Sequence, residues 1–201
     1  MSVSRSDDGT STVNEPGPLS SGDFWTSLSG SARWTFVGLT MVLAAAAVFL
    51  VDDVGTRSAL IMLSPLAAAA AIIDVLTHRI PTVLAMACGA VALSSCIVFA
   101  IIGRSWMPLI AGLVACAAVG IVFFTLWRFT GLGFGDVRLA AALAPIAGTI
   151  GWQAVVAFVV LAHLLAVPLA LCALARQRRD IAFGPAIVGG LYVAVALAPL
   201  L

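Results

Sequence analysis

The sequence predicts an all-α protein that crosses a membrane several times. Of its 201 residues, 62% are hydrophobic and only 9% are charged, whereas a soluble domain carries about 25% charged residues. A hydrocarbon core of about 30 Å requires about 20 apolar residues per helix, and apolar stretches of that size follow one another with short connections. We therefore expect six or seven spans and no sizeable soluble domain.

The chain divides into a tail, one additional helix and a membrane domain. Residues 1–32 are polar and are expected to form a disordered cytoplasmic tail. Residues 33–57 hold an extra N-terminal transmembrane helix and an outside loop, and residues 58–201 form the main domain, a core of about six helices. The expected spans are 34–51, 58–77, 81–102, 106–129, 136–150, 152–175 and 183–201. The fifth is short and rich in glycine at its end, so we expect it to lie partly in protein or water.

The arginines predict the orientation, because short cytoplasmic loops are enriched in Lys and Arg. With the N-terminus inside, most arginines fall on the cytoplasmic face and only Arg57 and Arg104 fall outside. The cytoplasmic set is Arg5, Arg33, Arg79, Arg128, Arg138, Arg176, Arg178 and Arg179. This asymmetry also supports the number of spans, since one helix fewer would scatter the arginines over both faces.

Composition excludes several classes of protein. Ten basic and nine acidic residues give a net charge of +1, which argues against a nucleic-acid partner. The cysteines lie in apolar stretches without CxxC spacing, so we expect small core residues and neither a metal site nor a disulfide framework. They are Cys88, Cys96, Cys116 and Cys172.

Two acidic residues lie at the edges of apolar spans. Asp74 comes near the end of the second span, and Asp136 opens the fifth. An ionisable residue in a transmembrane segment costs about 2.5–3.5 kcal/mol at the centre and less near the ends, so such residues tend to mark function. The expected topology brings both to the cytoplasmic ends of their helices. They can therefore lie at the same depth.

Two carboxyl groups at one depth suggest an aspartic protease. When they lie close together one keeps a proton while the other accepts a proton from a shared water. Asp74 stands at the negative end of its helix and Asp136 at the positive start of its own. We therefore hypothesise that Asp136 is the ionised member, although such a pair titrates as a unit.

Ordinary structural roles compete with this hypothesis. Asp136 could be a helix N-cap, and Asp74 could reach the membrane interface or pair with Arg79 or His78. Gly133 and Gly135 remove side chains before Asp136, which would let a peptide backbone approach and allow unusual φ angles, or they could form a flexible loop. Elsewhere, His163 is expected to hydrogen-bond across helices and the pair Gly189–Gly190 to permit close packing.

These residues resemble the type IV prepilin peptidases, membrane aspartic proteases with a Gly-x-Gly-Asp motif. The second catalytic aspartate of that family matches Asp136, in Gly133-Phe-Gly135-Asp136-Val-Arg138, and the first matches Asp74, followed by Arg79-Ile80-Pro81. Phe183-Gly184-Pro185 resembles a further family element. The sequence departs from the family pattern at Thr82, Arg138 and Ala182, and the span 34–51 lies outside the six-helix core.

The resemblance implies an aspartic endopeptidase without a cofactor. Its substrates would be type IV prepilins or pilin-like precursors, cut after a leader glycine at the cytoplasmic face of the bacterial inner membrane. Larger family members carry a cysteine-containing region associated with zinc and with methylation by S-adenosylmethionine. That region is missing from this sequence, so the resemblance is to the short Tad-type and preflagellin forms, which implies cleavage without methylation.

Three alternatives stay open. A small proton-coupled transporter could use Asp74 and Asp136 as relays, but it predicts deeper carboxylates and repeat symmetry. A pilus or secretion-system subunit could bind prepilins without cutting them. A presenilin-like protease shares Gly-x-Gly-Asp, but Tyr192 is the only tyrosine and is not followed by Asp.

Overall fold

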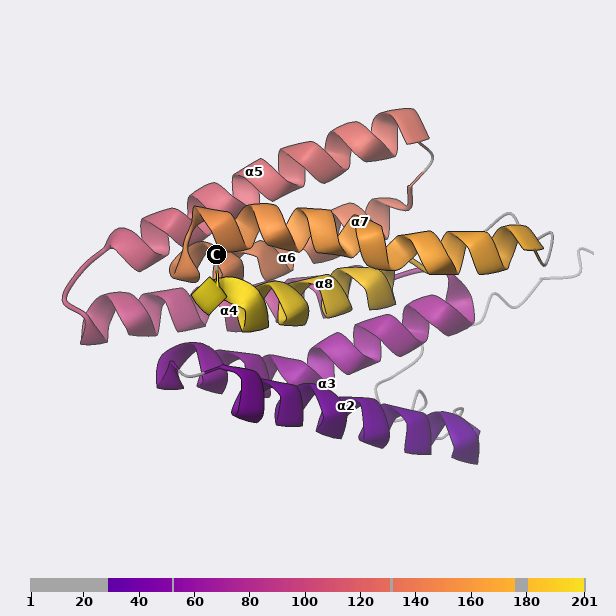
Figure 1. Cartoon of the computed structure of the whole chain (residues 1–201), viewed down its shortest axis with the longest axis horizontal. Coiled ribbons are helices and arrows are strands. Elements are labelled where there is room, and N and C mark those ends of the chain that lie inside the picture. The colour runs from indigo at the N-terminus through magenta and orange to yellow at the C-terminus, as the bar shows by residue number, and fades with distance from the viewer. Residues whose placement is uncertain (1–28, 52, 131, 176–180, 201) are drawn as a thin grey trace, which may run out of the picture. The chain divides into compact units, whose positions relative to one another are not determined.

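The computed structural model describes residues 29–51, 53–130, 132–175 and 181–200, and Thr35–Leu201 is one compact unit. The described ranges are helical and contain no strand, which confirms the expected all-α fold (Figure 1). The helices are α2 (Gly30–Leu50), α3 (Val54–Thr77), α4 (Thr82–Ile102), α5 (Met107–Thr130), α6 (Phe134–Ile150), α7 (Trp152–Ala175) and α8 (Gly184–Leu197), followed by the 3-10 turn η1 (Ala198–Leu200).

All helix ends lie within four residues of the expected spans. Helix α2 begins at Gly30 and so includes the end of the segment expected to be a disordered tail. By length and composition, α2, α3, α4, α5 and α7 can each cross a membrane. This is a multi-pass membrane protein. The shorter helices α6 and α8 have 17 and 14 residues.

Local chemistry explains where α3 begins and ends. At its start, the Asp53 side chain accepts a hydrogen bond of 2.6 Å from the Thr56 backbone N–H, which satisfies one of the unpaired donors of the first turn. At its end, His78 adopts a left-handed conformation with φ 50°, and its N–H donates to the Asp74 carbonyl at 2.8 Å. Pro81 then stands at the N-cap of α4.

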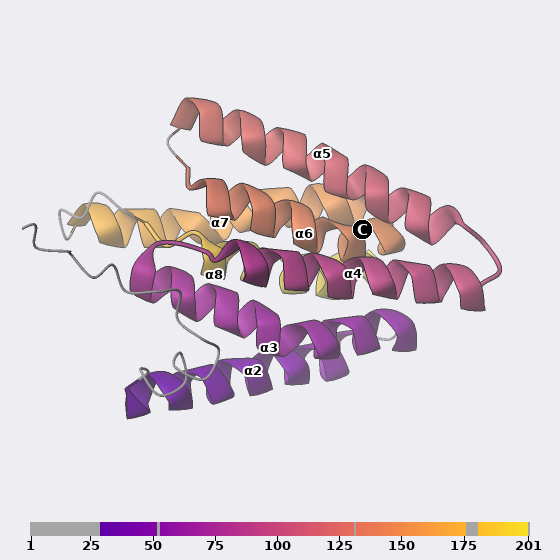
Figure 2. The same cartoon turned by 180° about the vertical axis from the view of Figure 1, so that it is seen from behind.

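Helix α6 lies at the centre of the packing. It contacts α4, α5, α7 and α8 along its length (Figures 1 and 2), and Leu139, Leu143 and Ala147 are fully buried. A Cβ added at Gly148 would lie 2.7 Å from the Ala111 carbonyl oxygen of α5, so glycine permits this close approach. The short fifth span is therefore enclosed largely by protein, in line with the expectation.

Helices α7 and α8 also pack closely. A Cβ at Gly190 would lie 2.6 Å from the Ala162 nitrogen, which confirms the expected role of the glycine pair. The expected cross-helix hydrogen bond of His163 is wrong: its Nδ1–H donates to the Val159 carbonyl one turn earlier, at 2.7 Å, because that carbonyl is within reach on the same helix. The imidazole instead packs beside aromatic rings of α5 and the α8 start.

The cysteines only partly follow the expectation that they lie in the core. Cys88 and Cys96 are buried, Cys116 is half-buried and Cys172 is exposed. Cys172 stands near the end of α7, beyond the last turn that packs in the core, so the expectation is wrong for this residue. All four are free thiols.

Candidate active site

Asp74 and Asp136 meet at one end of the helices. Asp74 lies in the last turn of α3 and Asp136 in the first turn of α6, and their side chains are only 4% and 7% exposed. Both line a cavity of about 640 Å³ and an adjoining one of about 300 Å³. The fold therefore brings two distant acidic residues to a shared space, which the sequence argument required.

A backbone donor from another helix holds the Asp74 side chain. Its Oδ2 accepts a hydrogen bond of 2.6 Å from the N–H of Gly184, the first residue of α8. A Cβ at position 184 would lie 2.9 Å from both Cβ and Oδ2 of Asp74, closer than unbonded atoms pack. An aspartate buried in this way does not reach out to the membrane interface, so that structural alternative is wrong.

Asp136 occupies the third position of α6. The N-cap is Gly133, and the Asp136 N–H donates to the Gly133 carbonyl at 3.1 Å. The alternative that Asp136 itself is the N-cap is therefore wrong. Its carboxyl lies within the first turn, where the exposed N–H groups of a helix favour negative charge.

The two glycines before Asp136, Gly133 and Gly135, lie close to other atoms of the chain. A Cβ at Gly133 would lie 3.0 Å from Asp136 Oδ2, and one at Gly135 would lie 3.1 Å from the Ile80 Cβ. Gly133 has φ −66°, an angle that any residue adopts, so the expectation of unusual φ angles is wrong there. Glycine is needed because the chain's own atoms fill the space of a side chain.

The neighbouring Arg and His side chains have different environments. Arg79 and His78 line both cavities with the aspartates. Arg138 instead donates a hydrogen bond to the Thr82 hydroxyl at the start of α4, and its guanidinium lies 4.5 Å from the centre of the Phe134 ring. The arginines at 176, 178 and 179 lie outside the described residues.

The Phe183-Gly184-Pro185 segment borders the same site. Phe183 is the N-cap of α8 and lines the larger cavity, while Pro185 lies in the first turn, where a missing N–H costs little. The Phe183 ring packs against Phe123 of α5 and His163 of α7, with ring centres 6.2 and 5.5 Å apart. Ile80 lines the smaller cavity and Pro81 follows it.

Four residues of the larger cavity were missed by the sequence analysis: Thr77, Thr130, Leu132 and Ile181. The two threonines are polar side chains at the ends of apolar helices, and that position could have identified them. The two aliphatic residues carry no comparable signal. They border the site because of how the chain enters α6 and α8.

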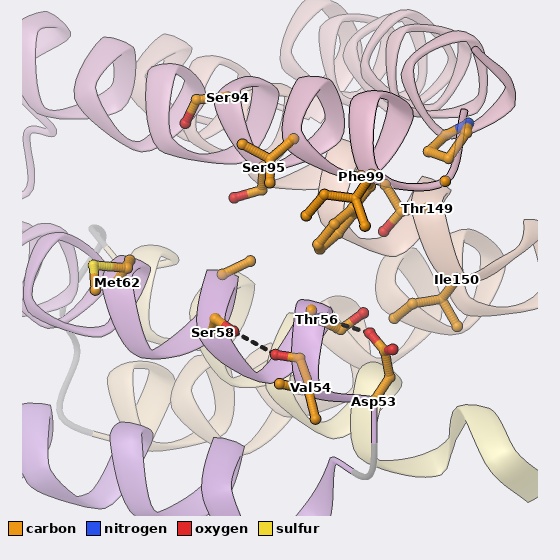
Figure 3. A pocket seen from close by; sticks show the side chains of 16 residues that line it. Asp53, Val54, Thr56, Ser58, Met62, Ser94, Ser95, Phe99, Thr149 and Ile150 are labelled. Carbon is orange, nitrogen blue, oxygen red and sulfur yellow. Dashed lines mark hydrogen bonds between the residues drawn. The ribbon is translucent and has the colours of Figure 1, made fainter. Parts of the chain in front are cut away.

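A further cavity, of about 770 Å³, lies at the other end of α3 (Figure 3). Four of its hydroxyl groups donate to carbonyls of their own helices: Ser58 to Val54, Ser94 and Ser95 to Val91, and Thr149 to Ile146. Among the described residues that line it, Asp53 is the one with a charged side chain. Those described residues therefore include no pair of carboxyl groups like that at the Asp74 end.

The Asp74 end can support acid–base chemistry on a bound chain. Two carboxyl groups share a cavity of about 640 Å³, which Arg79 and His78 also line. Among the described residues, no group of three His, Cys, Asp or Glu side chains is arranged to hold a metal ion.

Comparison with known proteins agrees with these features. No curated protein and no solved structure matches the chain. The family model for the type IV leader peptidase family matches residues 61–171, more than half of the chain and a range that includes both aspartates. The chain therefore belongs to the type IV leader peptidase family, whose members act on pilin-like precursors in general.

Proposed function

We propose that the protein is a membrane aspartic endopeptidase that removes the leader peptide of type IV prepilins or pilin-like precursors. The observation that carries the proposal is that two buried carboxyl groups, far apart in sequence, line one cavity. Membership of a leader peptidase family supports the reaction class. Asp74 and Asp136 are the proposed catalytic residues.

The proposed chemistry is hydrolysis by an activated water. One aspartate, as the carboxylate, accepts a proton from a water between the two groups while the oxygen of that water attacks the scissile carbonyl. The other, which carries a proton, donates a hydrogen bond to the carbonyl oxygen as negative charge develops there. The proton then passes to the leaving amine. No cofactor takes part in this scheme.

The location of the site fits a substrate that is itself partly embedded in the membrane. Both aspartates lie at helix ends, so a precursor whose apolar stem is in the bilayer can present its leader boundary there. We propose that this end faces the cytoplasm of a bacterial cell, with the N-terminus on the same side and the protein in the inner membrane. The distribution of arginines supports that orientation.

The domain assignment is part of the same proposal. Residues 58–201 would form the peptidase, and residues 33–57 an added transmembrane helix with its loop. We further propose cleavage without N-methylation, because the sequence contains no cysteine cluster like that of the larger, methylating family members.

The test is co-expression with a candidate prepilin, with leader removal measured as a change in mass. Wild type is expected to release the leader, and Asp74→Asn and Asp136→Asn are expected to leave the precursor intact. Unchanged leader removal in either variant would disprove the proposal that Asp74 and Asp136 act together as the catalytic pair. If folded wild type binds precursors but never cleaves them, a non-catalytic pilus or secretion-system subunit becomes the better interpretation.

A further inference from the structure

We infer that Gly184 is a positioning residue, whose backbone N–H holds the Asp74 carboxyl in its reactive orientation. The inference rests on the proposed function and gives the Phe183-Gly184-Pro185 segment a specific role. The contact joins residues 110 positions apart, is buried and measures 2.6 Å.

The donors of the first turn of α8 can be fully accounted for. A helix start leaves N–H groups without intrahelical acceptors, and here Pro185 has none to offer. Ala186 and Ile187 both donate to the Phe183 carbonyl, at 3.0 and 3.1 Å. The Phe183 side chain forms no capping hydrogen bond, so Gly184 is the donor that remains, and Asp74 accepts from it.

Only glycine fits at this contact. A side chain at position 184 would begin 2.9 Å from Asp74 Cβ and Oδ2, and 3.2 Å from its Cγ. The carboxyl would therefore have to rotate or shift. Because Oδ2 is engaged by the N–H, Asp74 offers Oδ1 to water and substrate, and the direction of that oxygen is set by the hydrogen bond.

The start of α8 is itself held in place from two other helices. The Phe183 ring packs against the fully buried Phe123 ring of α5 and the His163 imidazole of α7. That imidazole is fixed by its hydrogen bond to Val159. The Gly184 N–H is therefore held in place by packing against α5 and α7. A group that orients a catalytic side chain must be positioned to within a fraction of an ångström.

The kinetic test compares two alanine substitutions on α8. Gly184→Ala is expected to lower kcat for precursor cleavage by about 10²-fold with KM changed by less than about twofold, because misplacement of a reacting group by 1 Å has an effect of that size. Gly190→Ala is the matched control. Its Cβ would lie 2.6 Å from the Ala162 nitrogen, so it should lower thermal stability and leave kcat per folded molecule unchanged.

A second measurement detects the contact without activity. In protein labelled with ¹⁵N-glycine, the Gly184 amide proton should resonate downfield, and Asp74→Ala should move it upfield. Asp53→Ala, at the other end of α3, should leave it in place. If Asp74→Ala leaves the chemical shift of the Gly184 amide proton unchanged, the inference is wrong. This result can be obtained even if Gly184→Ala does not fold.

The outcomes separate this inference from the proposed function. If wild type cleaves precursors and folded Gly184→Ala keeps wild-type kcat, the inference fails and the proposed function stands. If wild type cleaves nothing although the resonance responds to Asp74→Ala, the proposed function fails, and with it the catalytic role given to Gly184.

Discussion

The two ends of α3 each carry an aspartate that accepts a backbone N–H, but the two contacts differ in kind. Asp53 caps its own helix, through Thr56 three residues away, and is exposed. Asp74 is buried and accepts from Gly184 at the start of a different helix. Both hydrogen bonds are 2.6 Å long, yet the first organises one turn of local structure and the second joins α3 to α8.

The surroundings of the two aspartates also differ. In the cavity beside Asp53 the Ser58 hydroxyl donates to the Val54 carbonyl (Figure 3), and the Ser95 hydroxyl donates to the Val91 carbonyl. Around Asp74 the cavity holds a second buried carboxyl. A long-range contact to the start of another helix, together with a partner carboxyl, distinguishes the position that we propose to be reactive from a capping one.

The comparison is tested most strongly by the pair Asp74→Asn and Asp53→Asn. The first removes a proposed acid–base group and should lower cleavage by at least about 10²-fold. The second keeps a good capping side chain and should cleave at the wild-type rate. Leader removal is followed by mass in matched membranes. Comparable losses in both variants would contradict the distinction between the two ends.

Two glycines extend the comparison. A Cβ at Gly133 would lie 3.0 Å from Asp136 Oδ2, whereas one at Gly55 would lie 2.6 Å from the Phe99 ring. Gly133→Ala should reduce kcat about tenfold by displacing a carboxyl. Gly55→Ala should overpack the helices and cost about 1–3 kcal/mol of stability without changing kcat. Turnover per folded molecule and thermal unfolding in detergent measure the two effects, and reversed effects would refute the assignment.

The middle of α3 provides a purely structural reference. The Tyr192 hydroxyl of α8 donates to the Leu60 carbonyl at 2.9 Å and lies 2.9 Å from the Ser64 oxygen. Tyr192→Phe removes this buried link and should cost about 1–3 kcal/mol, with KM unchanged. Ser58→Ala, at an exposed hydroxyl, is the control and should be nearly neutral. Equal thermal shifts in the two variants would contradict this account.

The smallest expected effect concerns pH. The backbone N–H of Thr56 lowers the pKa of Asp53 below its ordinary value, so ionised Asp53 favours the folded protein. That stability is present above the pKa of the unfolded chain, about 3.9, and is lost as pH falls through the lower pKa of the folded state. Asp53→Ala should cost about 1 kcal/mol at pH 6 and less at pH 3. Chemical unfolding at the two pH values measures this difference. A loss of stability in Asp53→Ala that is larger at pH 3 than at pH 6 would contradict the prediction.

Much of the fold could be predicted because apolar length and short connections leave few arrangements. The start of α6 and the burial of its far end followed from Asp136, Gly148 and Gly151 in the sequence. The meeting of Asp74 with Asp136 was expected from the alternation of helix direction, which places both at one depth. These inferences depend on local composition and on counting spans.

The contacts between distant segments could not be predicted in the same way. The position of Asp74 and Asp136 at the ends of their own helices says nothing about α8. Its first backbone N–H, that of Gly184, nevertheless donates to Asp74. The division of charge between the two aspartates therefore stays a prediction. Likewise, nothing in the sequence near Arg138 indicates Thr82 as its partner.

One consequence follows from the Gly184 contact for the identification of natural substrates. An asparagine carbonyl can accept the same N–H, so Asp74→Asn would keep α8 docked while lacking a carboxyl group that can exchange a proton. Such a variant would retain the shape of the cavity and release bound chains only by dissociation. If the proposed function is correct, precursors that co-purify with this variant can be identified by sequencing.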